Sequence, residues 1–223
     1  MSAAYLSLLL ADGRLPTGAH TQSGGLEPAL HAGMSVAEVP DYLRVRLRTV
    51  TETEAGTAVL ARAAWSGGDR GRRAGALGVV DQTWRARTPA DALRDAADLL
   101  GRSYLRMAAT VWDLHDLVAA RRTWCRAVVI GATAAAAGLS AAETARLVAF
   151  EDVQTVLAAA LKLAPFDPSQ GVAWAVAAEP EVERLVSTVS GLISVDELPA
   201  HSAPLIEQWG QIHRETERRL FRA

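Results

Sequence analysis

The chain has 223 residues, half of them apolar, and a formal net charge of −2. This charge argues against a nucleic-acid-binding protein, because such proteins are usually basic. The single cysteine, Cys125, excludes a disulfide framework and a cysteine-based metal cluster. The first ten residues lack the basic cluster of a signal peptide, so we expect a cytoplasmic protein. The longest uncharged run, residues 127–142, is shorter than the ~20 apolar residues of a membrane span, so no membrane segment is expected.

The segment of residues 11–31, ADGRLPTGAHTQSGGLEPALH, is irregular, because Pro16, Gly18, Gly24 and Gly25 interrupt any helix. It also contains many hydrogen-bonding side chains, and Glu27 stands in the first turn of a new helix, where a carboxylate is favoured. Such a segment is either a long surface loop or a functional loop on a helical framework.

A long helix is predicted next, from residue 35 to about residue 64. Ser35 and Glu38 form a capping box, and apolar residues follow at spacings of three and four. Residues 66–78 contain five glycines, which indicates an exposed loop and a weakly started helix. A phosphate-binding loop is not supported, because the G-x-x-x-x-G-K-[ST] spacing is absent.

The next helix is predicted to open at Thr88-Pro89-Ala90-Asp91 and to reach at least Trp112. Further along, Gly138 ends one helix, and Ser140 with Glu143 begins another. That helix, about residues 141–163, has no charge between residues 153 and 161 and is apolar on nearly all sides, so we expect it at the centre of the domain.

Further helices are predicted near residues 168–178, 180–190 and 203–222. The last of these carries one apolar stripe, formed by Leu205, Trp209, Ile212 and Leu220, with polar residues on the other side. No two-residue alternation typical of strands appears. The sequence therefore predicts an all-α fold, a single helical domain over residues 1–223 with roughly eight to ten helices around a buried apolar central helix.

No catalytic or metal-binding pattern is found. The five histidines are not spaced as i,i+4 pairs, and no H-E-x-x-H occurs, so a metal site built from neighbouring residues is not supported. A metal site assembled from distant residues or between subunits stays open. Ser23 does not lie in G-x-S-x-G. The positive charge of Arg126, next to Cys125, would lower the pKa of the thiol. A lone cysteine on a helical stretch is nevertheless more often inert. We predict no catalytic residue, no metal ligand and no cofactor.

Residues 15–27, LPTGAHTQSGGLE, resemble the N-terminal signature of the UreF family of urease accessory proteins. In that family, Pro-x-Gly is followed by an aromatic residue, a small polar pair and Ser-x-Gly-Leu-Glu. Three further stretches resemble the family in the same order, namely GRSYLRMAA (101–109), AVVIGATAAAAGL (127–139) and HRETERRLFR (213–222). The chain departs from the family at His20, which replaces the aromatic residue, at Cys125 and Arg126, where a histidine is frequent, and at Arg214, which follows His213 directly.

The resemblance implies an all-helical, cytoplasmic and homodimeric protein that is not an enzyme. It implies a chaperone or adaptor that binds a UreD/UreH-type accessory protein and the GTPase UreG. Together these proteins would insert nickel into apo-urease and couple the insertion to GTP hydrolysis. No nucleic acid or membrane is an expected partner.

Two regions are predicted to bind partners, an N-terminal loop of about residues 12–27 and a C-terminal tail of about residues 214–223. The tail joins arginines to an exposed Leu-Phe pair, and arginine and aromatic residues are frequent interface anchors. Two alternatives stay open, a small helical enzyme that uses the loop with His20 or His31, and a chaperone that binds nickel directly. The predicted partner-binding residues are Pro16, Gly18, His20, Ser23, Gly24, Gly25, Glu27, Arg218, Arg219, Leu220, Phe221 and Arg222.

Overall fold

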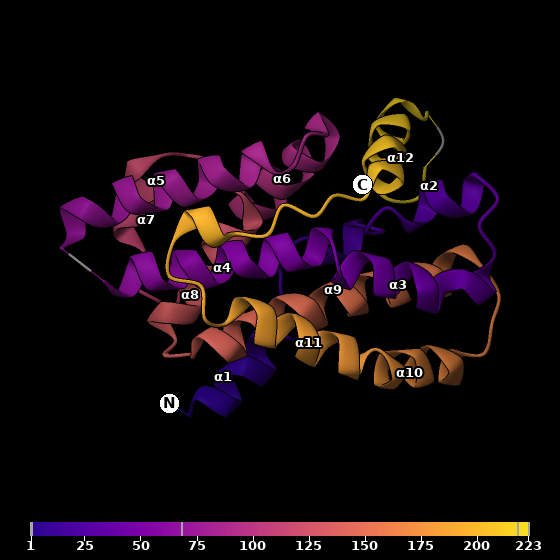
Figure 1. Ribbon diagram of the computed structural model, residues 1–223, viewed down its shortest axis with the longest axis horizontal. Coiled ribbons are helices and arrows are strands. Elements are labelled where there is room, and N and C mark those ends of the chain that lie inside the picture. Colours follow the sequence, from indigo (N-terminus) through magenta and orange to yellow (C-terminus); the bar gives the residue numbers. More distant parts are fainter. Residues whose placement is uncertain (1, 68, 218, 223) are drawn as a thin grey trace.

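The computed structural model describes residues 2–67, 69–217 and 219–222, and Figure 1 shows their arrangement. These ranges contain no β-strand, which confirms the predicted all-α single domain. The α-helices are α1 (Ala3–Leu10), α2 (Leu26–His31), α3 (Val39–Leu47), α4 (Val50–Ser66), α5 (Arg70–Ala86), α6 (Asp91–Ala108), α7 (His115–Ala120), α8 (Arg126–Ala136), α9 (Ala141–Leu163), α10 (Pro168–Ala177), α11 (Glu179–Val189) and α12 (Pro204–Glu215). Three short 3-10 helices are η1 (Ala19–Thr21), η2 (Val36–Glu38) and η3 (Val195–Glu197). None of the helices in the described ranges has the length and apolar character that crossing a bilayer requires.

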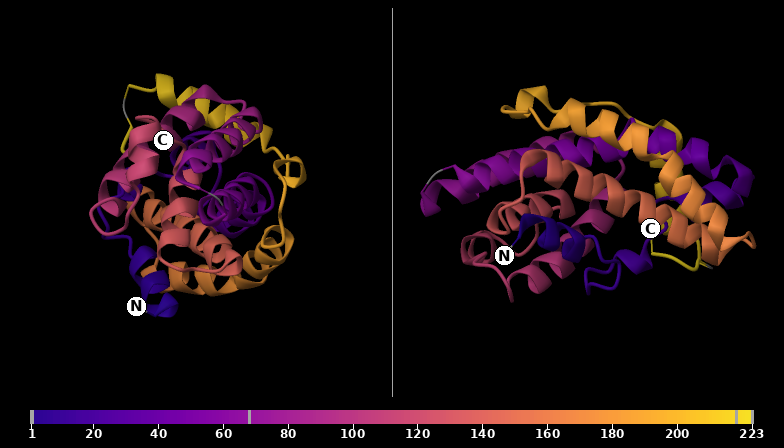
Figure 2. Two further views of the ribbon diagram at one scale, coloured as in Figure 1. Left: turned by 90° about the vertical axis from the view of Figure 1, so that its left-hand side faces the viewer. Right: turned by 90° about the horizontal axis from the view of Figure 1, so that it is seen from below.

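The hydrophobic core lies where α4, α8 and α9 meet. In Figure 1, α4 runs through the middle of the molecule, with α5 on one side and α11 on the other, and the left view of Figure 2 shows the same bundle from one end. The α9 helix buries Val153 and Val156 towards this centre, whereas Phe150 and Leu161 on its other side are exposed. The predicted central helix is therefore covered on its inner face and open on its outer one.

The helix predicted over residues 35–64 is divided into α3 and α4. The capping box of Ser35 and Glu38 is present, but Thr49 has φ −134° and ψ −95°, outside the helical region, and its hydroxyl donates to the Val45 carbonyl. Such side-chain bonds to the backbone compete with helix continuation. This break and two helices of six residues, α2 and α7, bring the number of α-helices in the described ranges to twelve.

The α5 helix begins at Arg70, so residues 66–78 contain the start of a helix, as expected, and Gly71, Gly75 and Gly78 lie within it. Two other predicted helix limits are wrong. The α6 helix begins at Asp91 and ends at Ala108, and its first amides are capped from another helix instead of by Thr88. The Ala90 amide donates to Glu207 at 2.9 Å and the Ala92 amide to Gln211 at 3.2 Å. The α12 helix ends at Glu215, and the described residues beyond it, 216–217 and 219–222, are not helical.

The buried face of α12 is also different from the expected apolar stripe. Ile206, Gly210 and His213 are buried, while Leu205 and Ile212 are exposed. The reason is the close approach of α6, because a Cβ added at Gly210 would lie 2.9 Å from a methyl group of Leu93. A glycine on the inner face thus decides which side of α12 packs.

Candidate functional site

The loop and the tail, which the sequence predicts as separate regions, lie against each other. Both carboxylate oxygens of Glu27 accept backbone N–H groups of the tail, from Leu220 at 2.6 Å and from Phe221 at 2.8 Å. The next amide, of Arg222, donates to the Thr21 carbonyl at 2.8 Å. Three consecutive main-chain donors therefore hold the tail on the loop. We call residues 16–27 and 219–222 the loop–tail junction.

The tail is anchored by Phe221, which is buried, while the neighbouring Leu220 is 63% exposed. The expectation of an exposed Leu-Phe pair is therefore wrong for Phe221, because its ring packs into the protein with the Lys162 ammonium 5.2 Å from the ring centroid. Arg219 donates to the His213 and Arg214 carbonyls at the end of α12, at 3.1 and 3.4 Å. This is a usual way of satisfying the last carbonyls of a helix. Arg218 lies outside the described residues.

The loop has an inner and an outer side. Ser23, Gly25 and Glu27 are buried, whereas Pro16 and His20 are exposed. Gly18, Gly24 and Gly25 have φ values of +83°, +61° and +80°, in the left-handed region that favours glycine. At Gly25 an added Cβ would also lie 2.8 Å from the Tyr42 hydroxyl oxygen. The inner residues therefore fix the shape in which the outer ones are presented.

A buried ion pair between Arg46 and Asp152 connects the loop to the protein core. The Gly24 carbonyl accepts from Arg46 at 2.6 Å and from the Tyr42 hydroxyl at 2.7 Å. Arg46 binds Asp152 of α9 with two hydrogen bonds, of 2.5 and 3.0 Å, and Thr51 donates to the same carboxylate at 2.7 Å. Burial alone would raise the pKa of Asp152, but the Arg46 guanidinium and the Thr51 hydroxyl hold that pKa below its ordinary value. The pair therefore stays ionised and connects the loop to the core.

Sequence reasoning missed both members of this pair. Arg46 stands between Leu43 and Leu47, which are buried, and Asp152 stands on a largely apolar helix. Arg46 follows Leu43 by three residues, a helical spacing that places the two side chains near each other, and Asp152 stands on the helix predicted to be central. Because charged residues are seldom fully buried without a partner, these positions are the signal that could have indicated a buried pair.

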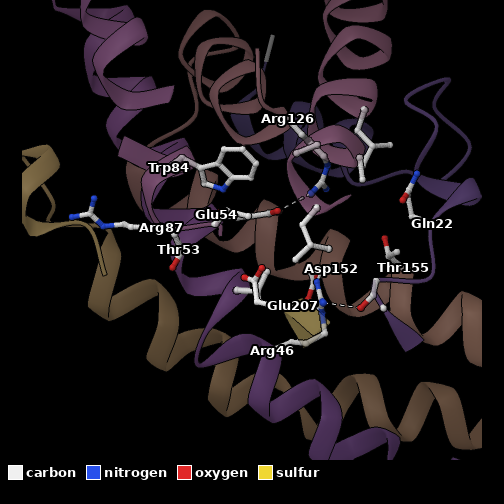
Figure 3. Close-up of a pocket in the computed structure, with 18 of the residues that line it drawn as sticks. Gln22, Arg46, Thr53, Glu54, Trp84, Arg87, Arg126, Asp152, Thr155 and Glu207 are labelled. Atoms are coloured by element: carbon white, nitrogen blue, oxygen red, sulfur yellow. Dashed lines mark hydrogen bonds and ion pairs between the residues drawn. The ribbon is translucent and has the colours of Figure 1, made fainter. Parts of the chain in front are cut away.

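A small cavity with both charged and apolar walls lies beneath the loop (Figure 3). Its volume is about 100 Å³, and its walls include Gln22, Arg46 and Asp152. Arg126 also lines it and binds Glu54 at 3.2 Å and Glu151 at 2.7 Å. Burial raises the pKa of both glutamates, and Arg126 opposes this shift. In the described part of the chain, no group of three or more His, Cys, Asp or Glu side chains could hold a metal ion.

The hydroxyl and the thiol that could serve as nucleophiles are poorly placed for catalysis. Ser23 is completely buried under the loop. Burial raises the pKa of Cys125 well above its ordinary value, with the Asp81 carboxylate acting in the same direction, so this side chain remains a thiol. The lowering of this pKa by Arg126 that the sequence suggests does not occur.

The buried His213 contacts both the tail and Glu27. Its Nε2 lies 3.1 Å from the Phe221 carbonyl and 3.5 Å from Glu27, and its Nδ1 has no hydrogen-bond partner among the described residues. Burial lowers the pKa of His213, and the Phe221 carbonyl and Glu27 only partly offset this effect. The folded protein therefore holds a neutral imidazole that donates from Nε2.

Because the folded pKa of His213 is lowered, its contribution to stability is complete above its ordinary pKa of about 6.5 and is lost as the pH falls below that value. When the pH falls from about 8 to about 5.5, we expect the free energy of unfolding, measured by urea denaturation, to decrease more for wild type than for His213→Gln. The control is His115→Gln, since the His115 side chain is exposed and its removal should leave the pH dependence of wild type unchanged. The prediction would be contradicted if the free energy of unfolding changed equally with pH in wild type and in His213→Gln.

Comparison with known proteins identifies relatives along the whole chain. The sequence model of the family described as UreF matches residues 34–179. A urease accessory protein UreF from Mycolicibacterium vanbaalenii is 36% identical and covers 99% of each chain. Proteins of the same name from Mycobacterium sp. (strain JLS) and Mycobacterium tuberculosis are 34% and 31% identical, over 96% and 99% of each chain.

Proposed function

Because the chain belongs to the UreF family of urease accessory proteins, we propose that it is a non-catalytic adaptor in the insertion of nickel into apo-urease. It would act in the cytoplasm as a homodimer, bridge a UreD/UreH-type protein and the GTPase UreG, and modulate GTP hydrolysis by UreG. An accessory role is what the names of the relatives state, and the position of Ser23 and Cys125 in the interior fits a protein without its own nucleophile.

The observation that carries the proposal is the loop–tail junction. Glu27 binds the tail through main-chain amides, so this interaction leaves the side chains of Leu220 and Arg222 available for a partner. Leu220 and Arg222 are exposed, and so are Pro16 and His20 of the loop. Apolar and arginine side chains presented on a fixed backbone are suited to protein recognition.

The predicted partner-binding residues therefore divide into two groups. One group is proposed to contact the partner directly, namely Pro16, His20, Leu220 and Arg222. The other is proposed to hold the contact surface in shape, namely Gly18, Ser23, Gly24, Gly25, Glu27, Arg219 and Phe221.

Removing the anchors of the tail should abolish the surface without unfolding the domain. We expect Arg219→Ala/Phe221→Ala to weaken binding of the UreD/UreH-type protein at least about tenfold, equivalent to about 1.4 kcal/mol. Affinity is measured by pull-down and by titration of the purified proteins. Ile193→Ala is the control, since Ile193 is highly exposed and outside the junction. Undiminished binding by the double variant, with the control behaving as wild type, would remove the tail from the proposed surface.

A further inference from the structure

A groove runs beside the loop–tail junction, between α6, α12 and the tail. Its volume is about 360 Å³. The floor is apolar and includes Pro28 of α2, Leu93 and Leu99 of α6, and Gly210 of α12. Such a floor accepts an apolar side chain of a ligand, because it offers little to a hydrated ion.

The rim of the groove is basic, although the protein as a whole is slightly acidic. Arg214, Arg219 and Arg222 line it, against Asp95 as the acidic lining residue. This leaves an excess of positive charge on a chain whose formal net charge is −2. Arg214 pairs with Asp95 at 3.1 Å, but both side chains are more than half exposed, so water screens the pair and a competing carboxylate can take its place.

The backbone of Arg222 is fixed, while its side chain is exposed. Its amide is held by the Thr21 carbonyl, and the preceding residue is the buried Phe221. A guanidinium on a fixed backbone is suited to carboxylates, since its planar fork binds both oxygens of one carboxylate at little cost in entropy.

We propose that this groove binds an acidic segment of a partner protein, with an apolar side chain on the floor and carboxylates against Arg214 and Arg222. The inference rests on the proposed function, because the segment would belong to the UreD/UreH-type protein. A free phosphate group would use the arginines but not the apolar floor.

The test is titration of the full-length protein with its purified UreD/UreH-type partner at about 50 and about 300 mM NaCl, a range over which exposed charges become screened. We expect the affinity of wild type to fall at least about tenfold across this range, and Arg222→Glu to lower it at least about tenfold at low salt. The matched control is Arg122→Glu, an exposed arginine outside the groove, which should bind within about twofold of wild type. Circular dichroism confirms that each variant is folded.

The outcomes separate the two proposals. If wild type binds the partner and Arg222→Glu binds equally well, the acidic-segment inference is wrong and the adaptor role stands. If wild type does not bind at all, both proposals fail. If inorganic phosphate displaces the partner while chloride at the same ionic strength does not, the groove is a phosphate site and the inference is overturned.

Discussion

Replacing Gly131 by alanine is expected to destabilise the protein by about 3 kcal/mol or more. Gly131 lies on α8 where this helix meets α4. An added Cβ would lie 2.2 Å from the Ala58 carbonyl oxygen and 2.9 Å from the Arg62 amide nitrogen. Both are backbone atoms of a packed helix, so they cannot move aside unless the two helices separate. Urea denaturation of wild type and variant, with comparison of the free energies of unfolding, measures the effect.

The matched control for this prediction is Gly75→Ala. Gly75 is an exposed residue of α5, and no atom lies within 4 Å of the position that its Cβ would take. Alanine is favoured over glycine within a helix, so this variant should be more stable than wild type by up to about 1 kcal/mol. Equal effects of the two substitutions would show that α4 and α8 do not approach as closely as described.

Helix ends could be predicted from the sequence where local interactions determine them. The capping boxes of Ser35 with Glu38 and of Ser140 with Glu143 are present, and Gly138 has the positive φ expected of a helix end. The start signal at residues 88–91 places the beginning of α6 within two or three residues, but its capping partner could not be predicted, because Glu207 is distant in the sequence. Tertiary capping leaves no local pattern to recognise.

In the candidate site, too, the local features could be predicted from the sequence and the tertiary contacts could not. The glycines of the loop and the arginines of the tail mark two unusual regions, but nothing in the sequence indicates that they meet. Glu27 joins them through backbone amides of Leu220 and Phe221, and every residue other than proline has such an amide. The position of Glu27 in the first turn of a helix accounts for a carboxylate there, without revealing that its oxygens bind the tail.

The ion pair below the loop predicts the second large effect. Asp152→Ala should lower the free energy of unfolding by about 3–5 kcal/mol, because it leaves the guanidinium of Arg46 buried without its carboxylate. It also leaves the Thr51 hydroxyl without this acceptor. Glu183→Ala is the control, since it removes an ion pair with Arg146 that is largely exposed, and it should cost less than about 1 kcal/mol.

A double variant separates the stability of the pair from its effect on the loop. Arg46→Leu/Asp152→Leu removes both charges, and replacing a buried ion pair by apolar residues often restores much of the stability lost in the single variant. The Gly24 carbonyl would nevertheless lose one of its two donors and keep the Tyr42 hydroxyl alone. We therefore expect the double variant to be more stable than Asp152→Ala but to bind the UreD/UreH-type partner more weakly than wild type. Affinity equal to that of wild type would show that the ion pair serves stability alone, and that Tyr42 and the left-handed glycines suffice to shape the loop.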